Sequence, residues 1–302
     1  MFGCVGSVLA KIINDYTGIT YILFFLTPCV LSASAFFYSY INYQMELFTV
    51  HEPTTKPIPL IANLPHSGLY IPQQIASQLS EAYLPNQDWH LNKLYDFLPQ
   101  LGITVLQANY SRYVVDLNRA IQEPLAGNFW SCVIPLQTAF GQAIYKINPS
   151  QDQVEGRIPK FYSSYHNKLE ELLKEKIAEF GKVYLLDLHS FGGLIDDQIC
   201  LGNLNGQSCS EFLISTVEEC FTNKGLQVVK NKTFTGGFIT KNYSQITGVE
   251  ALQIEIRYNV YLDLQQLDKQ RHPDWNVPEF YQAKSIFQEI FSCLVKKLGI
   301  SQ

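Results

Sequence analysis

The sequence predicts an α/β fold in which helices form a layer on each face of a mixed, mostly parallel β-sheet. From Met45 onwards, short apolar runs rich in β-forming residues alternate with stretches of helical periodicity. Each helical stretch carries one apolar stripe, which is typical of a helix that covers one face of a sheet. The chain has 302 residues, of which 47% are hydrophobic and 13% aromatic, so it can bury the core of one large domain.

The predicted elements follow each other along the globular part of the chain. The strands are expected at residues 58–63, 104–108, 113–117, 183–188, 227–229 and 251–256. The helices are expected at residues 88–101, 159–179, 210–223 and 278–298. The segment 122–156 is long for a simple connection, so we expect it to border a functional site.

Charge and cysteine content exclude two classes of protein. The 22 basic and 27 acidic residues give a net charge of −5, and no basic patch with interleaved aromatic residues marks a nucleic-acid interface. The seven cysteines are an odd number without C-x-x-C spacing, which favours free thiols over a disulfide framework. A Cys200–Cys209 pair is the less favoured alternative.

Residues 1–44 form a hydrophobic extension ahead of a single predicted catalytic domain at residues 45–302. Residues 19–41 carry no charge and are long enough to span a membrane. They could be a membrane anchor, with Lys11 the only basic residue near their start, or a secretory signal with a cleavage-like Ala33-Ser34-Ala35. We favour a third interpretation, a start placed upstream of the true one at Met45, which predicts a cytoplasmic protein. The anchored form is the next alternative.

Two predicted strands end in the same pair of polar residues. The run from Val183 to Leu188 leads into His189-Ser190 and two glycines, and the run before His66 leads into His66-Ser67-Gly68. Ligands of open α/β sheets collect outside the carboxyl ends of strands, and imidazole is a common zinc ligand. The pattern therefore predicts a metal site that contains His66 and His189. The alternative for either residue is a structural histidine without a ligand.

Asp88 is the candidate for a third metal ligand. It opens a predicted helix and is short and anionic. The common alternative for an aspartate in this place is an N-cap of the helix.

Two arginines and a glutamate complete the candidate site. Arg112 and Arg119 bracket a predicted strand, and a guanidinium binds a carboxylate through two parallel hydrogen bonds, so they suggest an anionic substrate. The alternative is a pair of structural salt bridges to Asp116 or Asp187. Glu255 lies among apolar residues of a late strand, where burial makes a carboxylate a candidate general base. Its alternative is an ion pair with Arg257.

No motif indicates a competing chemistry. The sequence contains no G-x-S-x-G elbow, no glycine-rich phosphate loop, no dinucleotide fingerprint and no H-E-x-x-H. Ser67 and Ser190 each follow a histidine directly, so strand alternation points each serine away from its neighbouring imidazole.

In chain order, a set of motifs resembles the N-formylglutamate amidohydrolase (N-formylglutamate deformylase) family, over residues 58 to 261. The motifs are Leu64-Pro-His-Ser-Gly68, Asp88-Trp-His90, Ser111-Arg-Tyr-Val-Val-Asp-Leu-Asn-Arg119, Tyr165-His166, Leu186-Asp-Leu-His-Ser190, Gly236-Gly-Phe-Ile-Thr240 and Leu252-Gln-Ile-Glu255. The family is similar in fold to the zinc carboxypeptidases and to aspartoacylase. The resemblance implies an enzyme that hydrolyses N-formyl-L-glutamate to formate and glutamate, a step of histidine breakdown, with one divalent metal, expected to be Zn²⁺.

The resemblance also implies roles for individual residues. The metal ligands are His66, Asp88 and His189; the proton-transferring base is Glu255; the oxyanion is stabilised by Arg112; and the substrate carboxylate is bound by Asn118 and Arg119, with Lys241 where other members carry an arginine. Two departures stand out: position 69 is Leu69 rather than an acidic ligand, and Phe-Gly-Gly-Leu follows His189-Ser190. The partner is a small anionic N-acyl amino acid. The alternatives are a hydrolase of another N-acyl amino acid or of a cell-wall or peptide amide, and a non-catalytic binder of small anionic ligands.

Overall fold

The computed structural model describes residues 9–14, 20–25, 45–81, 83–193, 196–267 and 269–300. The chain divides into two compact units, Met1–Glu46 and Leu47–Gln302. In the first unit, β1 (Leu9–Asn14) pairs with β2 (Thr20–Phe25) as an antiparallel hairpin. The candidate span 19–41 lies mostly outside the described residues. Among the residues that are described, no helix has the length and apolar character needed to cross a membrane.

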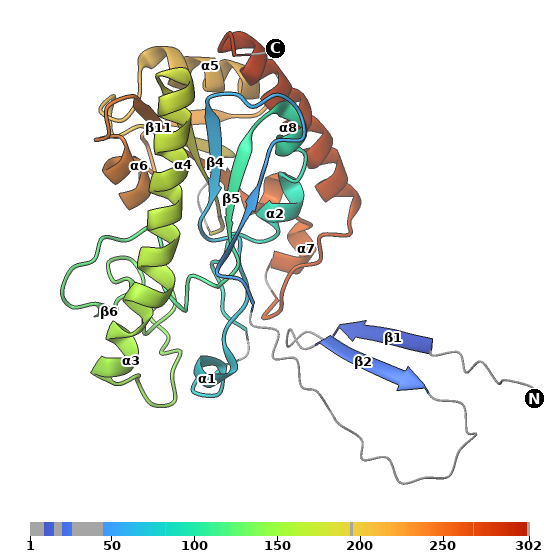
Figure 1. Cartoon of the computed structure of the whole chain (residues 1–302), viewed down its shortest axis with the longest axis vertical. Coiled ribbons are helices and arrows are strands. Elements are labelled where there is room, and N and C mark those ends of the chain that lie inside the picture. The colour runs from blue at the N-terminus through green and yellow to red at the C-terminus, as the bar shows by residue number, and fades with distance from the viewer. Residues whose placement is uncertain are drawn as a thin grey trace, which may run out of the picture. The chain divides into compact units, whose positions relative to one another are not determined.

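The second unit is built on a seven-stranded sheet with the order β10-β9-β11-β8-β4-β5-β3 (Figure 1). Its strands are β3 (Phe48–His51), β4 (Leu60–Leu64), β5 (Thr104–Ala108), β8 (Val183–Phe191), β9 (Ile199–Gly202), β10 (Val228–Lys230) and β11 (Val249–Arg257). The pairs β3–β5 and β9–β11 are antiparallel, and the other four are parallel. The prediction of a mixed, mostly parallel sheet is confirmed. A separate two-stranded sheet joins β6 (Ala126–Gly127) to β7 (Ile134–Pro135).

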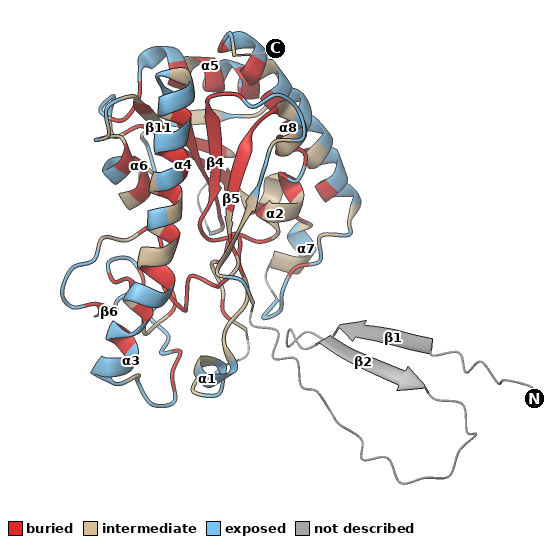
Figure 2. Cartoon of the chain, in the orientation of Figure 1, coloured by how far each residue is buried: buried red, intermediate tan, exposed pale blue. Residues whose placement is uncertain are grey.

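Helices cover both faces of the sheet. One face packs against α2 (Leu91–Leu94), α5 (Glu211–Thr222) and α8 (Pro278–Lys297) in one large hydrophobic core. The other face is covered by α4 (Ser164–Phe180) and α6 (Phe238–Tyr243) (Figure 1). Burial follows from this arrangement: all nine residues of β8 are buried, whereas α4 and α8 each keep an exposed face (Figure 2). The remaining short helices are α1 (Gln73–Ala76), α3 (Gln151–Glu155) and α7 (Leu264–Leu267).

Three of the predicted elements differ in the structure. The strand predicted at 113–117 is wrong, because this segment is a buried loop that begins with a turn, in which Val114 N donates to Ser111 O at 2.8 Å. The helix predicted at 88–101 is divided into α2 and a 3-10 helix (Leu98–Leu101). His90, with φ 58°, starts α2, and the proline at position 99 cannot donate a helical hydrogen bond. The helix predicted at 159–179 begins with a π-helical turn (Ile158–Ser163) before α4.

The cysteines in the described part of the chain are free. Cys132, Cys200, Cys209, Cys220 and Cys293 form no disulfide there, which confirms free thiols at these positions. Cys200 and Cys209 are therefore not paired. Cys4 and Cys29 lie outside the described residues.

Candidate active site

The site is built at the carboxyl ends of three adjacent strands. The turn after β4 carries His66, and β8 carries His189 on the sheet face that α4 and α6 cover. On β11, Glu255 is the register partner of His189, and Gln253 is the register partner of Asp187. Because facing residues of neighbouring strands share one face of the sheet, the backbone pairing itself places the glutamate beside the histidine.

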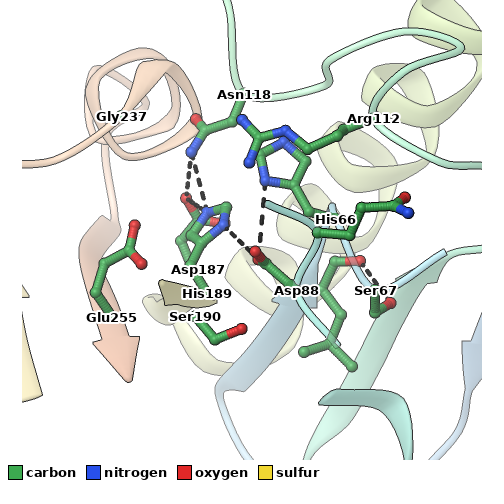
Figure 3. Close-up of polar contacts among 12 residues, drawn as sticks. His66, Ser67, Asp88, Arg112, Asn118, Asp187, His189, Ser190, Gly237 and Glu255 are labelled. Carbon is green, nitrogen blue, oxygen red and sulfur yellow. Dashed lines mark hydrogen bonds and ion pairs between the residues drawn. The ribbon is translucent and has the colours of Figure 1, made fainter. Parts of the chain in front are cut away.

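Three predicted metal ligands meet at one point. The carboxylate of Asp88 lies between the two imidazole rings (Figure 3), with its Oδ2 at 3.0 Å from Nδ1 of His189 and 3.8 Å from Nδ1 of His66. All three residues are buried, and one ligand atom of each lies within 4.8 Å of the others. Asp88 belongs to the loop before α2, whose N-cap is His90, so the N-cap alternative for Asp88 is wrong.

This set of donors fits a divalent cation. Two ligand atoms bound tetrahedrally to one zinc ion stand about 3.4 Å apart, close to the observed separations. Nδ1 of His66 is buried and has no hydrogen-bond partner among the described residues, so a lone pair there is available for coordination. Two imidazoles and one carboxylate form the typical ligand set of a hydrolytic zinc.

A buried aspartate stands behind each histidine. Nε2 of His66 lies 2.8 Å from Asp116 Oδ1, and Nε2 of His189 lies 3.1 Å from Asp187 Oδ2. At His66, an Nε2–H that donates to Asp116 leaves Nδ1 unprotonated toward the candidate metal and fixes the ring. At His189, Nε2 also lies 3.0 Å from Nδ2 of Asn118, so Asp187 and Asn118 together fix this ring. Nδ1 of both rings therefore faces the carboxylate of Asp88.

The pKa values of the two histidines are shifted in opposite directions. Burial and Arg112 lower the pKa of His66, which keeps its imidazole neutral. Burial also opposes the charged form of His189, but Asp187 and Asp88 outweigh it and raise its pKa well above the usual value. Two carboxylates around one ring create an anionic centre that a proton or a metal cation can neutralise.

Glu255 faces the same cavity from β11. Burial raises its pKa to about 7, Asp88 adds to this effect, and His189 opposes it. Gln253 Nε2 donates a hydrogen bond of 2.7 Å to Glu255 Oε1. The alternative of an ion pair with Arg257 is wrong, because Arg257 Nη1 instead lies 3.4 Å from Asp196 Oδ1. A buried carboxyl with a pKa near neutrality is suited to proton transfer.

The arginines have different surroundings. Arg112 Nη2 lies 2.6 Å from Asp116 Oδ2, so the salt bridge weighed as its alternative is present, while Arg112 also lines the cavity. Arg119 Nη1 donates to Asn118 O at 3.0 Å, and its buried Nε has no hydrogen-bond partner in the described part of the chain. Arg119 therefore keeps a buried donor, Nε, that no described residue uses.

The cavity has a volume of about 400 Å³. Its predicted members are His66, Asp88, Arg112, Asn118, Arg119, His189 and Glu255. Phe129 and Trp130 also line it, so the expectation that the segment 122–156 borders the site is confirmed. Lys241 does not line this cavity. It lines a neighbouring one of about 640 Å³ that shares Asn118 and Arg119 with it.

The two serines that follow the histidines take part in structural hydrogen bonds. Ser67 Oγ donates to Leu64 O at 3.1 Å, and Ser190 Oγ accepts from the hydroxyl of Tyr261 at 2.9 Å. Neither contact activates a hydroxyl through an imidazole, as a serine nucleophile requires.

Sequence reasoning did not assign a role to several residues of the site. The sequence suggests Asp116 and Asp187 as partners of arginine. The structure places each of them against a histidine, and Asp116 binds Arg112 as well. For Asp187 a signal existed, because residues 187 and 189 of one strand share a face. For Gln253, Gly237 and Trp130 the chain offered no comparable signal, since their places depend on contacts between distant segments.

The comparisons with known proteins agree with this geometry. Residues 58–262 match the family model described as N-formylglutamate amidohydrolase. An N-formylglutamate deformylase of Pseudomonas aeruginosa is 34% identical over 223 residues, which cover 69% of this chain and 84% of the relative. The enzyme of the same name from Pseudomonas putida is 32% identical over 221 residues, which cover 68% of this chain and 82% of the relative. The crystal structure of an N-formylglutamate amidohydrolase from Ralstonia eutropha JMP134 has the same fold, with a TM-score of 0.71 and 23% identity over 85% of this chain and 99% of that one. This chain belongs to the N-formylglutamate amidohydrolase family.

Proposed function

We propose that this protein hydrolyses N-formyl-L-glutamate to formate and glutamate in a metal-dependent reaction. The observation that carries the proposal is the convergence of His66, Asp88 and His189 beside the buried Glu255, in a chain whose curated relatives are named N-formylglutamate deformylase. The family resemblance supports a role of the reaction in histidine breakdown in the cytoplasm.

His66, Asp88 and His189 would hold the ion, and Zn²⁺ suits two imidazoles and a carboxylate. An ion held by these three residues would supply Lewis acidity toward the acyl oxygen and would lower the pKa of a water molecule. Asp116 and Asp187 orient the two imidazoles through their Nε2 atoms.

The protein's own groups then perform the proton transfers. The carboxylate of Glu255 accepts a proton from the attacking water molecule while the oxygen of that water bonds to the formyl carbon. It returns that proton to the amide nitrogen as the carbon–nitrogen bond breaks, so that formate and the free amino group of glutamate are released. Arg112 lines the cavity and stabilises the negative charge that develops on the acyl oxygen.

The substrate is anionic, and the cavity offers cationic and amide donors to its carboxylates. We assign one carboxylate to Asn118 and Arg119, whose buried Nε has no hydrogen-bond partner among the described residues. Lys241 lies at the neighbouring cavity, where it can attract the more distant carboxylate of glutamate.

The test measures formate release by the purified protein with added Zn²⁺ for the wild type and for Glu255→Gln, together with bound metal. We expect the wild type to release formate and the variant to lose about 10²- to 10⁴-fold in rate. Both should bind the same amount of metal. Equal rates would exclude Glu255 as the base.

A panel of formyl, acetyl and peptide amides tests the substrate. Faster cleavage of an amide other than N-formylglutamate would reassign the substrate within the amidohydrolases. A protein that binds no metal and releases no formate, but is still stabilised by glutamate-like ligands, would be a binder.

A further inference from the structure

Gln253 is a buried polar residue that the chemistry above does not use. It lies on β11 two residues before Glu255, on the same face of the sheet, and only 4% of it is exposed. Its register partner on β8 is Asp187. Gln253 therefore stands next to Glu255 along β11 and beside Asp187 across the ladder.

The hydrogen bonds of Gln253 determine the orientation of its amide. The backbone N–H of Gly237 donates to Gln253 Oε1. Because a backbone N–H can only donate, Oε1 must face Gly237, and the NH₂ group must face Glu255. Gln253 Nε2 then donates to Glu255 Oε1 at 2.7 Å. One oxygen of Glu255 is thereby held, while its Oε2 makes no side-chain hydrogen bond within the described part of the chain.

The backbone donor at Gly237 is itself held in place. A Cβ at Gly237 would lie 2.4–2.7 Å from the side-chain amide of Asn118, so only glycine fits there. Two residues later, Ile239 N donates to Asn118 Oδ1 at 2.8 Å. Asn118 Nδ2 lies 3.0 Å from His189 Nε2 (Figure 3). The start of α6, from its N-cap Gly237 to Ile239, thus binds Gln253 on one side and Asn118 on the other.

We propose that Gln253 is a positioning residue for the general base: it holds Oε1 of Glu255, so that Oε2 is directed to the reacting water. This inference rests on the proposed function. It adds to that function a residue which acts through Glu255 and does not touch the substrate. A displaced base loses the alignment that proton transfer needs, while substrate binding by Asn118 and Arg119 is left unchanged.

The experiment is a double-mutant cycle between Gln253→Met and Glu255→Gln. Methionine keeps the length of the side chain and removes both hydrogen bonds. In the wild-type background, we expect Gln253→Met to lower kcat about ten- to a hundredfold with little change in KM. In the Glu255→Gln background, the same change should have no further effect, because the base it positions is already absent.

Controls separate this role from a structural one. Gln107 on β5 does not line the cavity, and its Nε2 donates to Asn109 Oδ1 at 3.0 Å. Gln107→Met removes this hydrogen bond and should leave kcat unchanged. Bound metal and Tm are measured for every variant. Gln253→Asn, which keeps the amide on a shorter side chain, should recover part of the lost kcat, and it replaces Gln253→Met in the cycle if the methionine variant does not fold.

The outcomes distinguish the two proposals. An equal loss in both backgrounds, a change in KM alone, or loss of bound metal in Gln253→Met would overturn the role of Gln253 while formate release by the wild type stands. Absence of formate release from the metal-loaded wild type would overturn the proposed function, and this role with it.

Discussion

At the scale of single residues, the site depends on how each histidine is held. His66 and His189 both direct Nδ1 toward Asp88, because a buried aspartate lies behind each ring at Nε2. A substitution that removes the carboxylate behind an imidazole leaves the ring less well oriented and less basic, but it keeps the candidate metal ligand.

We therefore expect Asp187→Asn to weaken zinc binding about 10- to 100-fold, as measured by competition with a chromophoric chelator. The matched control is Asp197→Asn, which removes the surface partner of Lys232 and should leave the affinity unchanged. Equal zinc affinities of the wild type and Asp187→Asn would contradict an orienting role for this carboxylate.

The activity should also depend on the protonation of Glu255. Burial raises its pKa from 4.5 to about 7, and the base must be ionised to accept a proton. A nearby cation favours the carboxylate and lowers this pKa. We therefore expect kcat/KM to rise with pH on the acidic side of the profile, and the midpoint of this rise to lie between 4.5 and about 7. A rate that falls as the pH is raised through this range would rule out an ionised Glu255 as the base.

How far the sequence predicts the site is clearest at this scale. The two histidines and Glu255 could be found because each follows or lies in an apolar strand pattern. The role of Asp116 could not, because its segment reads as a strand but folds as a loop, in which Asn118 N donates to Asp116 Oδ1 at 2.9 Å. The local hydrogen bond of an aspartate to the backbone two residues on competes with strand pairing and turns the chain.

At the scale of elements, strands with continuous apolar runs were the most predictable. The central strand β8 is buried on both faces, so its continuous apolar run predicts a strand without knowledge of the strands that pair with it. The strands β3 and β9 were not expected, since each has only four residues and depends on a neighbour for its pairing. The long predicted helix at 88–101 failed because periodicity does not report the left-handed conformation of His90.

The helix α5 offers a test of local stabilisation away from the site. Ser210 caps it by accepting a hydrogen bond from Leu213 N at 3.3 Å, and its hydroxyl also contacts Glu250. We expect Ser210→Ala to lower the free energy of unfolding by about 1 kcal/mol, measured by urea denaturation, without loss of activity. Ser215→Ala, at a partly exposed position of the same helix where the hydroxyl donates to Glu211 at 2.7 Å, should change it by less than about 0.5 kcal/mol. Equal effects of the two substitutions would argue against the cap.

At the scale of the whole molecule, the cavity belongs to one compact unit. Every residue that lines it lies within Leu47–Gln302, and the family match covers residues 58–262. We propose that residues 45–302 form a self-sufficient catalytic domain.

A chain that begins at Met45 should therefore retain the kcat/KM of the full chain for formate release. A chain that begins at Pro59 lacks β3, which pairs with β5 at the edge of the sheet, and it should unfold at a lower temperature. Loss of activity on removal of residues 1–44 would assign them a part in the function.

The pairing of β8 with β11 has a consequence for how the enzyme responds to substrate. His189 and Glu255 face each other across a parallel ladder, and neighbouring strands keep a spacing of about 4.8 Å. Changing their separation would require opening the middle of the sheet, so this pair is in place before the substrate binds. The residues that adjust to the substrate are then expected in the loops that line the cavity, which include Trp130. A change in the fluorescence of Trp130 can report the binding of a ligand.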